Sequence, residues 1–222
     1  MNLQKKFINI ILIHIIMPIE VFKTNESPFG LSYEDHIKNY WKFTCKIPKD
    51  RNPAIDNNGQ RDEIANQNSN APVFYLNSSD KGDTRVERRC RVPAGKGIFI
   101  PVFGVEVSEI EVQNSTVNDL KRIAKKDQDS ANDLSAKLDG NEVSDIKSFR
   151  KSTNEFEIEF PQNALFKCPQ GTSKAVADGY YIITKPLSPG THTVEVKGKV
   201  ETNEPIFDPI FSVDIKYTLE VQ

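Results

Sequence analysis

The stretch AVADGYYIITKPLSPGTHTVEVKGKV, residues 175–200, decides the fold class of this chain. Residues 180–185 are rich in aromatic and β-branched side chains, and residues 193–200 alternate polar side chains with valines, both of which favour strands. Ser188-Pro189-Gly190, which lies between them, is typical of a turn. The pattern predicts a β-hairpin made of a strand, a tight turn and a second strand.

The same period of two recurs along the chain. Residues 211–221 alternate apolar with polar side chains, and residues 156–160 alternate Phe or Ile with Glu. Each pattern predicts a strand with one buried and one solvent-facing side. Residues 134–143 predict a second hairpin, because Asp139-Gly140 readily adopts the positive φ of a two-residue turn. Residues 98–103 are apolar on both faces and predict a central strand.

Two segments predict helices. Residues 32–47 begin with Ser32, a good N-cap, end before Pro48, and carry apolar residues at spacings typical of one helical face. Residues 117–126 predict a short surface helix. Because the predicted strands outnumber these helices and are joined by Gly, Pro and Asn turns, the sequence predicts a mainly β fold. We expect an antiparallel β-sandwich, jelly-roll-like, with one N-terminal amphipathic helix and one short surface helix.

The 222 residues divide into a short N-terminal segment and a single β-sandwich domain over residues 18–222. Residues 1–17 contain Lys5-Lys6 and then an apolar run that is too short for a bilayer, which needs roughly 20 apolar residues. Either this segment is a secretory leader, which implies export, or translation starts at Met17, which favours a cytoplasmic protein. No transmembrane helix is expected, and the oligomeric state stays open.

The composition excludes several partners. A net charge of −2 and a pI of about 6.0 provide no general attraction to nucleic acid or to an anionic membrane. Cys45, Cys90 and Cys168 form no C-x-x-C pair, so the sequence predicts no zinc or redox site. One disulfide with a free thiol and three reduced thiols both stay open.

No motif for catalysis is present. The sequence has no G-x-S-x-G elbow, phosphate loop or H-E-x-x-H pair, and we assign no catalytic residue. Asp127, Asp129 and Asp133 resemble the start of a calcium loop, but the expected glycine is absent and Leu138 stands where the closing glutamate belongs. We therefore expect neither a metal nor a cofactor.

Five residues are candidates for a binding site: Arg88, Asp178, Tyr180, His192 and Trp41. Arg88 shares a strand face with apolar residues, so it lies at a sheet rim or is paired with a carboxylate. His192 has the parity of the valines that follow it, and is either a structural histidine or a ligand or general base. Trp41 is either a core anchor against a sheet or a platform for a ligand.

Residues 51–70 are polar, with Asn52-Pro53 and Asn57-Asn58-Gly59, and predict a long surface loop. Because such loops often carry function, the first hypothesis is a non-enzymatic protein that binds an unknown ligand or protein partner through this loop and nearby rim residues. The alternative is an enzyme acting on carbohydrate, with Asp178 or Glu157 as its carboxylate. An exported structural or envelope component is the third hypothesis.

Three stretches resemble a β-rich family of archaea and bacteria that has no assigned activity. They are FGLSY (residues 29–33) leading to Trp41, RCRVPAGK (residues 89–96), and DGYY (residues 178–181) followed by KPLSPG and His192. The resemblance implies that exported bacterial relatives pair the cysteine at position 90 with one in the long loop. Residues 62–67 contain no cysteine here, which disfavours that disulfide and favours a cytoplasmic protein.

Overall fold

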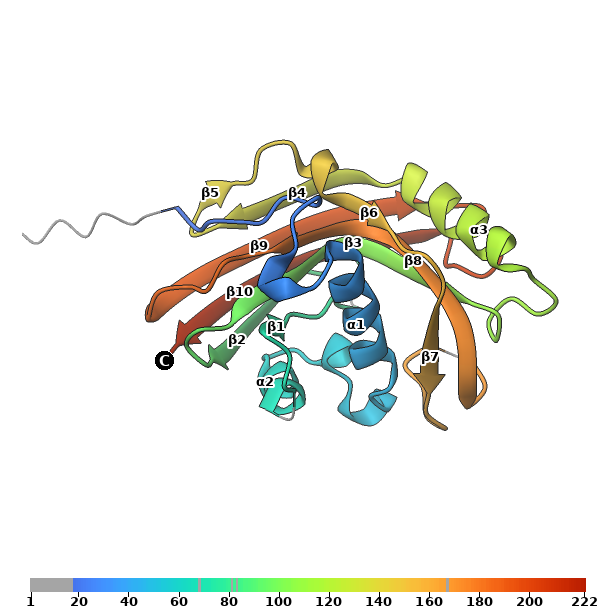
Figure 1. Cartoon of the computed structure of the whole chain (residues 1–222), viewed down its shortest axis with the longest axis horizontal. Coiled ribbons are helices and arrows are strands. Elements are labelled where there is room, and N and C mark those ends of the chain that lie inside the picture. Colours follow the sequence, from blue (N-terminus) through green and yellow to red (C-terminus); the bar gives the residue numbers. More distant parts are fainter. Residues whose placement is uncertain (1–17, 68, 81, 83, 167) are drawn as a thin grey trace, which may run out of the picture.

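The structure is a computed structural model that describes residues 18–222 except 68, 81, 83 and 167. The choice between a leader and a start at Met17 therefore lies outside the described residues. Ten strands form two five-stranded sheets in the described part of the chain (Figure 1). The strands are β1 (Val73–Tyr75), β2 (Val86–Val92), β3 (Gly97–Ser108), β4 (Asn132–Leu138), β5 (Asn141–Glu142), β6 (Arg150–Ser152), β7 (Phe156–Phe160), β8 (Gly171–Ile183), β9 (Gly190–Glu201) and β10 (Ile210–Val221).

Both sheets are mixed. Sheet 1 has the order β1-β3-β8-β6, and β7 also pairs with β8; sheet 2 has the order β2-β10-β9-β4-β5. Most pairs are antiparallel, but β1 is parallel to β3 and β2 is parallel to β10. The mainly β class is confirmed, whereas the expectation of purely antiparallel sheets is wrong.

The largest hydrophobic cluster contains residues of both sheets. Sheet 1 contributes Ile98 and Ile182, and sheet 2 contributes Val196 and Leu219. The alternation of residues 211–221 accounts for the second contribution, because successive side chains of a strand point to opposite sides of the sheet. In β10, Val213, Ile215, Tyr217, Leu219 and Val221 are buried as predicted.

The hairpin predicted over residues 175–200 does not form. Strand β8 belongs to sheet 1, whereas β9 lies in sheet 2 between β10 and β4. Both edges of β8 are already occupied, one by β3 and the other by β6 and β7. After β8 the chain contacts the residues that precede α1, where the Lys185 amide donates to the Glu20 carbonyl, and then crosses to the other sheet. The second predicted hairpin is confirmed by β4 and β5, with φ of +48° at Asp139 and +76° at Gly140.

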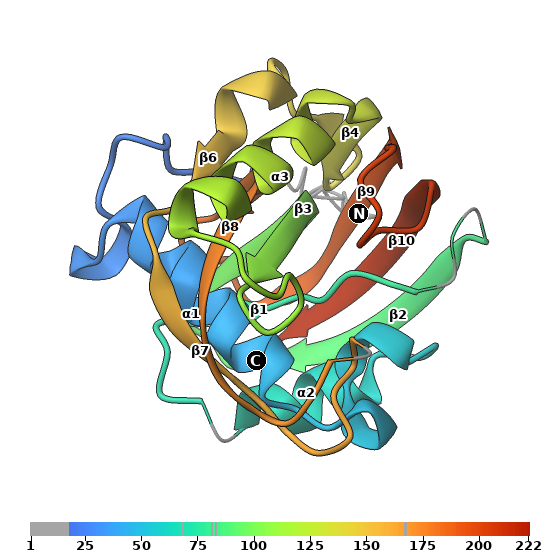
Figure 2. The ribbon, with the colours of Figure 1, turned by 90° about the vertical axis from the view of Figure 1, so that its right-hand side faces the viewer.

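Three α-helices are described: α1 (Tyr33–Cys45), α2 (Gln60–Gln67) and α3 (Val117–Asp129). Four short 3-10 helices accompany them: η1 (Pro28–Gly30), η2 (Lys49–Arg51), η3 (Pro53–Ile55) and η4 (Ile146–Phe149). Helix α1 begins as predicted, with the Ser32 hydroxyl accepting from the Asp35 amide, and packs on the face of sheet 1 that is turned away from sheet 2. Helix α3 packs against Val107 of β3 and Val176 of β8, on the face of sheet 1 opposite to α1 (Figures 1 and 2). Helix α2 was not predicted.

A bulge in β3 changes which residues face the core. The register with β8 shifts between Pro101 and Phe103, so that even positions before the bulge and odd positions after it face the same side. As a result Glu106 points to the side covered by α1 and is 5% exposed. Strand β3 therefore continues through the bulge to Ser108, beyond the central strand predicted at residues 98–103.

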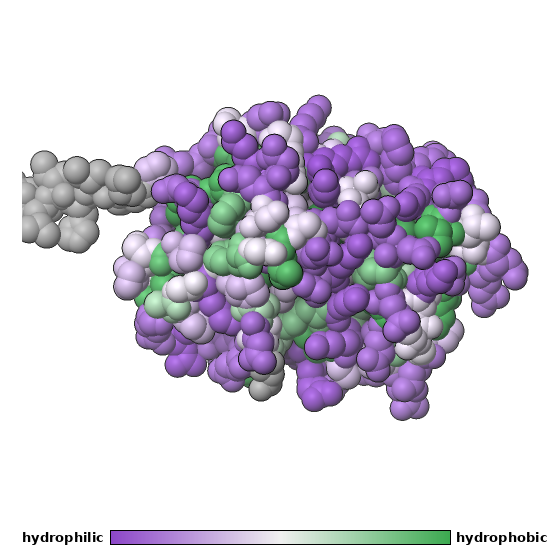
Figure 3. Space-filling model, in the orientation of Figure 1, coloured by the Kyte–Doolittle hydropathy of each residue, from purple (hydrophilic) through white to green (hydrophobic). Residues whose placement is uncertain are grey.

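The surface drawn in Figure 3 is mainly hydrophilic, with hydrophobic residues in small separate groups. Among the described residues, large apolar side chains are well exposed only at Ile64, Phe166, Ile206 and Ile210. No helix of the described chain has the length and apolar character needed to cross a membrane.

Candidate functional site

Arg88 lies in β2 on the face that is turned toward the core, and its side chain is 0% exposed. Its guanidinium donates to three backbone carbonyls at short distance: Asp56 at 3.0 Å, Asn77 at 2.9 Å and Ser78 at 3.2 Å. It also donates to the Ala54 carbonyl at 3.3 Å and to the Tyr217 hydroxyl at 2.5 Å. A buried guanidinium requires such partners, because an unpaired buried charge is strongly destabilising.

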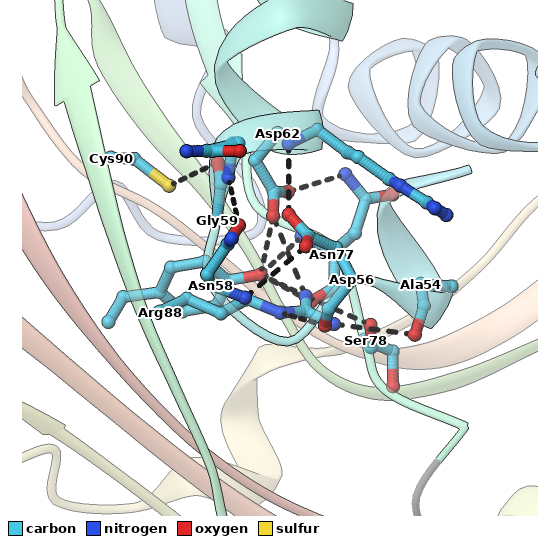
Figure 4. A network of polar contacts seen from close by, with 12 residues as sticks. Ala54, Asp56, Asn58, Gly59, Asp62, Asn77, Ser78, Arg88 and Cys90 are labelled. Carbon is cyan, nitrogen blue, oxygen red and sulfur yellow. Dashed lines mark hydrogen bonds and ion pairs between the residues drawn. The ribbon is translucent and has the colours of Figure 1, made fainter. Parts of the chain in front are cut away.

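Asp62 of α2 completes the network around Arg88 (Figure 4). Its carboxylate lies 3.6 Å from Arg88 Nη1, is also 0% exposed, and accepts from Asn77 Nδ2 at 3.0 Å. Tyr217 of β10 stands between the partners, since its hydroxyl accepts from Arg88 and lies 3.3 Å from Asp62 Oδ2. The paired alternative for Arg88 is therefore the observed one, with Asp62 as its carboxylate.

Burial raises the pKa of Asp62 to about 7, even though the Arg88 guanidinium and the hydrogen bonds from Asn77 and Tyr217 favour its charged form. Burial also raises the pKa of the Cys90 thiol, whose Sγ donates to the Gly59 carbonyl at 3.3 Å. Cys90 is a free, buried cysteine that lacks the exposure of a reactive thiol.

The segment predicted as a long surface loop, residues 51–70, is largely ordered around this network. It contains η3 and α2 and runs along the free edge of β2, where the Asn58 carbonyl accepts from the Arg89 amide and the Glu63 carboxylate accepts from the Arg91 amide. Asn66 is buried and bonds both the amide and the carbonyl of Tyr75. The loop interpretation was wrong because these polar side chains serve the backbone of neighbouring strands. The segment covers a sheet edge that would otherwise expose unpaired backbone groups.

His192 and Trp41 also have internal partners. His192 Nδ1 lies 2.7 Å from Asp139 Oδ2 and Nε2 lies 2.9 Å from the Ser188 carbonyl, which ties the β4–β5 turn to the start of β9. Trp41 is 7% exposed and its indole donates to the Tyr181 hydroxyl at 2.9 Å. His192 is thus held by hydrogen bonds within the protein, and Trp41 is packed in the core.

Asp178 and Tyr180, by contrast, lie together with an arginine that sequence reasoning missed. Arg150 of β6 donates to both carboxylate oxygens of Asp178, at 3.0 and 2.9 Å, and its guanidinium lies 5.9 Å from the centre of the Tyr180 ring. It also bonds Asp129 of α3 at 2.8 Å. The two hydrogen bonds from Arg150 to Asp178 fix β6 against β8, and the bond to Asp129 fixes α3 against β6.

A groove of about 600 Å³ opens beside this pair, between α3, β6 and β8. Its floor is formed by buried residues of β8, and its rim is polar and charged. The lining residues are Glu34, Lys121, Ala124, Lys125, Arg150, Lys151, Ser152, Thr153, Asn154, Val176, Ala177 and Asp178. Of the five candidate residues only Asp178 lines the groove.

The structure does not bring the other candidates to this place. Glu157 lines a separate depression of about 380 Å³ with Glu109, Ile110, Thr172, Ser173 and Lys174. Asp178, Arg88 and His192 each have a different charged partner: Arg150, Asp62 and Asp139. Within the described chain, no three His, Cys, Asp or Glu residues are placed to hold a metal ion.

Comparison of this mainly β, two-sheet chain with protein families, with characterised proteins and with solved structures finds no match. The resemblance to a β-rich archaeal and bacterial family stays a prediction.

Proposed function

We propose that this protein is a non-enzymatic β-sandwich that binds a ligand in the groove between α3, β6 and β8. The hydrophobic cluster shared by the two sheets supports the sandwich, while the parallel pairs β1/β3 and β2/β10 depart from the pairing of a jelly roll. The observation that carries the binding proposal is the 600 Å³ groove itself, which has the size of a small-molecule site and a charged rim above a buried floor.

The geometry favours this groove over the 51–70 segment as the binding element. The donors and acceptors of Arg88, Asp62 and Asn66 in and around that segment are directed at other protein atoms, so they have little capacity left for a ligand. Lys121 and Lys151, in contrast, line the groove without a carboxylate partner among the described residues; Lys121 is exposed and bonds the neutral Asn154 side chain, and Lys151 is half-buried.

The carbohydrate enzyme receives less support. That hypothesis needs Asp178, Glu157, Arg88 and His192 to converge, and each lies with different partners. The groove lining also contains no aromatic side chain among the described residues, although sugar rings commonly stack on aromatic faces.

The envelope component depends on residues 1–17, which the structure does not describe. Exported proteins can carry glycans at Asn-x-Ser triplets, and Asn77-Ser78-Ser79 is one such triplet. The Asn77 side chain, however, is buried and bonds Asp62 and Thr44. A glycan at this position is incompatible with the folded structure.

Fragment screening by two-dimensional amide NMR tests the binding proposal. We expect compounds from a library of neutral, anionic and cationic fragments to shift amides of residues 150–154 and 176–178 in a saturable manner. Ser152→Trp, which fills the groove at an exposed position, should abolish these shifts, whereas Ser144→Trp, also exposed but outside the lining, should retain them. If no fragment of any charge shifts these amides, the groove is not a binding site.

A further inference from the structure

We propose that this groove selects an anionic ligand, one that carries phosphate or carboxylate groups; the inference rests on the proposed function of the groove as a binding site. The charged lining residues are four cations and two carboxylates: Lys121, Lys125, Arg150 and Lys151 against Glu34 and Asp178. This local excess of positive charge stands out because the whole chain has a net charge of −2.

Both carboxylates of the lining are already neutralised by partners in the protein. Asp178 accepts the forked pair of hydrogen bonds from Arg150. Glu34 lies 2.8 Å from Lys38 Nζ and accepts from the Asn154 amide at 2.7 Å. Although partial burial works against the charged form of Glu34, these hydrogen bonds lower its pKa. The two acids therefore offer little attraction to a cationic ligand. Asp129, beside the lining, pairs with Lys125 and Arg150, so Lys121 and Lys151 are the lining cations without a carboxylate partner among the described residues.

The lysines are held loosely. Lys121 Nζ lies 3.3 Å from Asn154 Oδ1, a neutral acceptor, so it keeps its charge uncompensated at that contact. Lys125 pairs with Asp129 at 2.5 Å, but both side chains are exposed, and such pairs contribute little and exchange readily. An incoming oxyanion can replace these partners without leaving a buried group unsatisfied.

The lysines also come from two sides of the groove. Lys121 and Lys125 are four residues apart in α3 and thus lie on the same helical face, while Lys151 belongs to β6. An anion near Lys121 and Lys125 lies against α3, and Lys151 adds positive charge from the neighbouring strand β6. Charges of one sign lining a concave surface concentrate the electrostatic field and favour ligands of the opposite sign.

Amide NMR titrations with sodium phosphate and with sodium citrate, at constant ionic strength, test the inference and distinguish the two kinds of anion. We expect at least one of them to shift the amides of residues 150–154 and 176–178. The double variant Lys121→Gln/Lys151→Gln should bind about tenfold more weakly, since each exposed ion pair contributes a few-fold in affinity. The charge-matched control Lys42→Gln/Lys137→Gln changes two exposed lysines outside the lining and should bind as the wild type does.

Two outcomes overturn the inference. If both double variants weaken binding equally, the attraction comes from the overall charge and not from the groove. If neutral or cationic fragments shift the groove amides while phosphate and citrate do not, the groove binds ligands but does not select anions. That second result leaves the proposed function intact. If neither the fragments nor the two anions shift the groove amides, the proposed function itself is refuted.

Discussion

Replacing Arg88 by Met should destabilise the fold by about 3–5 kcal/mol, the range typical of removing one partner from a buried ion pair. The substitution keeps an unbranched side chain of similar length but removes every donor. Asp62 then loses the buried cation with which it pairs, and the carbonyls of Asp56, Asn77 and Ser78 lose a hydrogen bond each. Since small domains are stable by about 5–15 kcal/mol, the loss is a large share of the total.

The pH dependence of this loss has a definite sign. The folded pKa of Asp62, about 7, lies above the value of about 3.9 for an unfolded Asp, so the wild type loses stability as pH rises between these values. Arg88 lowers the folded pKa, and its removal raises it further. The variant therefore continues to lose stability above pH 7, and the difference from wild type should be larger at pH 8.5 than at pH 6.

Urea denaturation of Arg88→Met, followed by circular dichroism, measures both effects. Arg89→Met is the control, because the neighbouring side chain is 72% exposed on the other face of β2 and should cost less than 0.5 kcal/mol. Adding Asp62→Asn to Arg88→Met should recover part of the loss, since it removes the uncompensated charge. A loss below about 1 kcal/mol, or no recovery in the double variant, would refute the assignment of Arg88 as the anchor of residues 54–63.

Two further predictions concern other buried positions. Glu106→Gln should make stability fall less steeply with rising pH, because burial holds the pKa of Glu106 well above its usual range and the folded state gives up its proton late. The urea midpoints at pH 5 and pH 8 should therefore differ less in the variant than in wild type, with exposed Glu159→Gln as the control. An equal difference in the variant and the wild type would contradict this. Gly59→Ala should lower the melting temperature more than Gly95→Ala: both have positive φ, +92° and +84°, but only at Gly59 does a Cβ meet backbone, at 2.5 Å. Equal losses would show that conformation alone matters.

The sequence predicted those elements whose signal is local. The alternation at residues 156–160 gives a strand with Phe156, Ile158 and Phe160 buried and Glu157 and Glu159 exposed. The same holds for β10 and for the Ser32 cap of α1. In these cases the period and the capping residue themselves determine the structure, so no knowledge of distant partners is required.

The pairing of β4 with β5 followed from the Asp139-Gly140 turn, but the partners of β8 and β9 could not be predicted in this way. The turn residues between β8 and β9 end one strand and start another, but they do not decide which edge each strand joins. That choice depends on β3, β6 and β7, which take both edges of β8 and come from elsewhere in the chain. For β8 and β9, local turn chemistry was therefore sufficient to place the strands and insufficient to pair them.

The partners of the candidate site residues could not be predicted either, because they also depend on contacts between distant parts of the chain. The parity of Arg88 left two alternatives, a place at a sheet rim or a carboxylate partner, and neither the choice between them nor the identity of Asp62 could be predicted without the fold. The sequence pattern around Arg150 did not indicate its role, because that role depends on contacts with Asp178 and Asp129, which are distant in sequence. Polar residues in sequence become informative once the backbone that they satisfy is known.

Saturation of donors separates structural cations from those available to a ligand. Arg88 is buried with its donors directed at carbonyls and the Tyr217 hydroxyl, and Arg150 donates to Asp178, Asp129 and the Lys125 carbonyl. A ligand that took over these donors would have to leave protein acceptors unpaired, at a cost comparable to its own gain. Lys121 and Lys151 carry no such penalty, so variants at these two lysines report on binding, and variants at the two arginines report on folding.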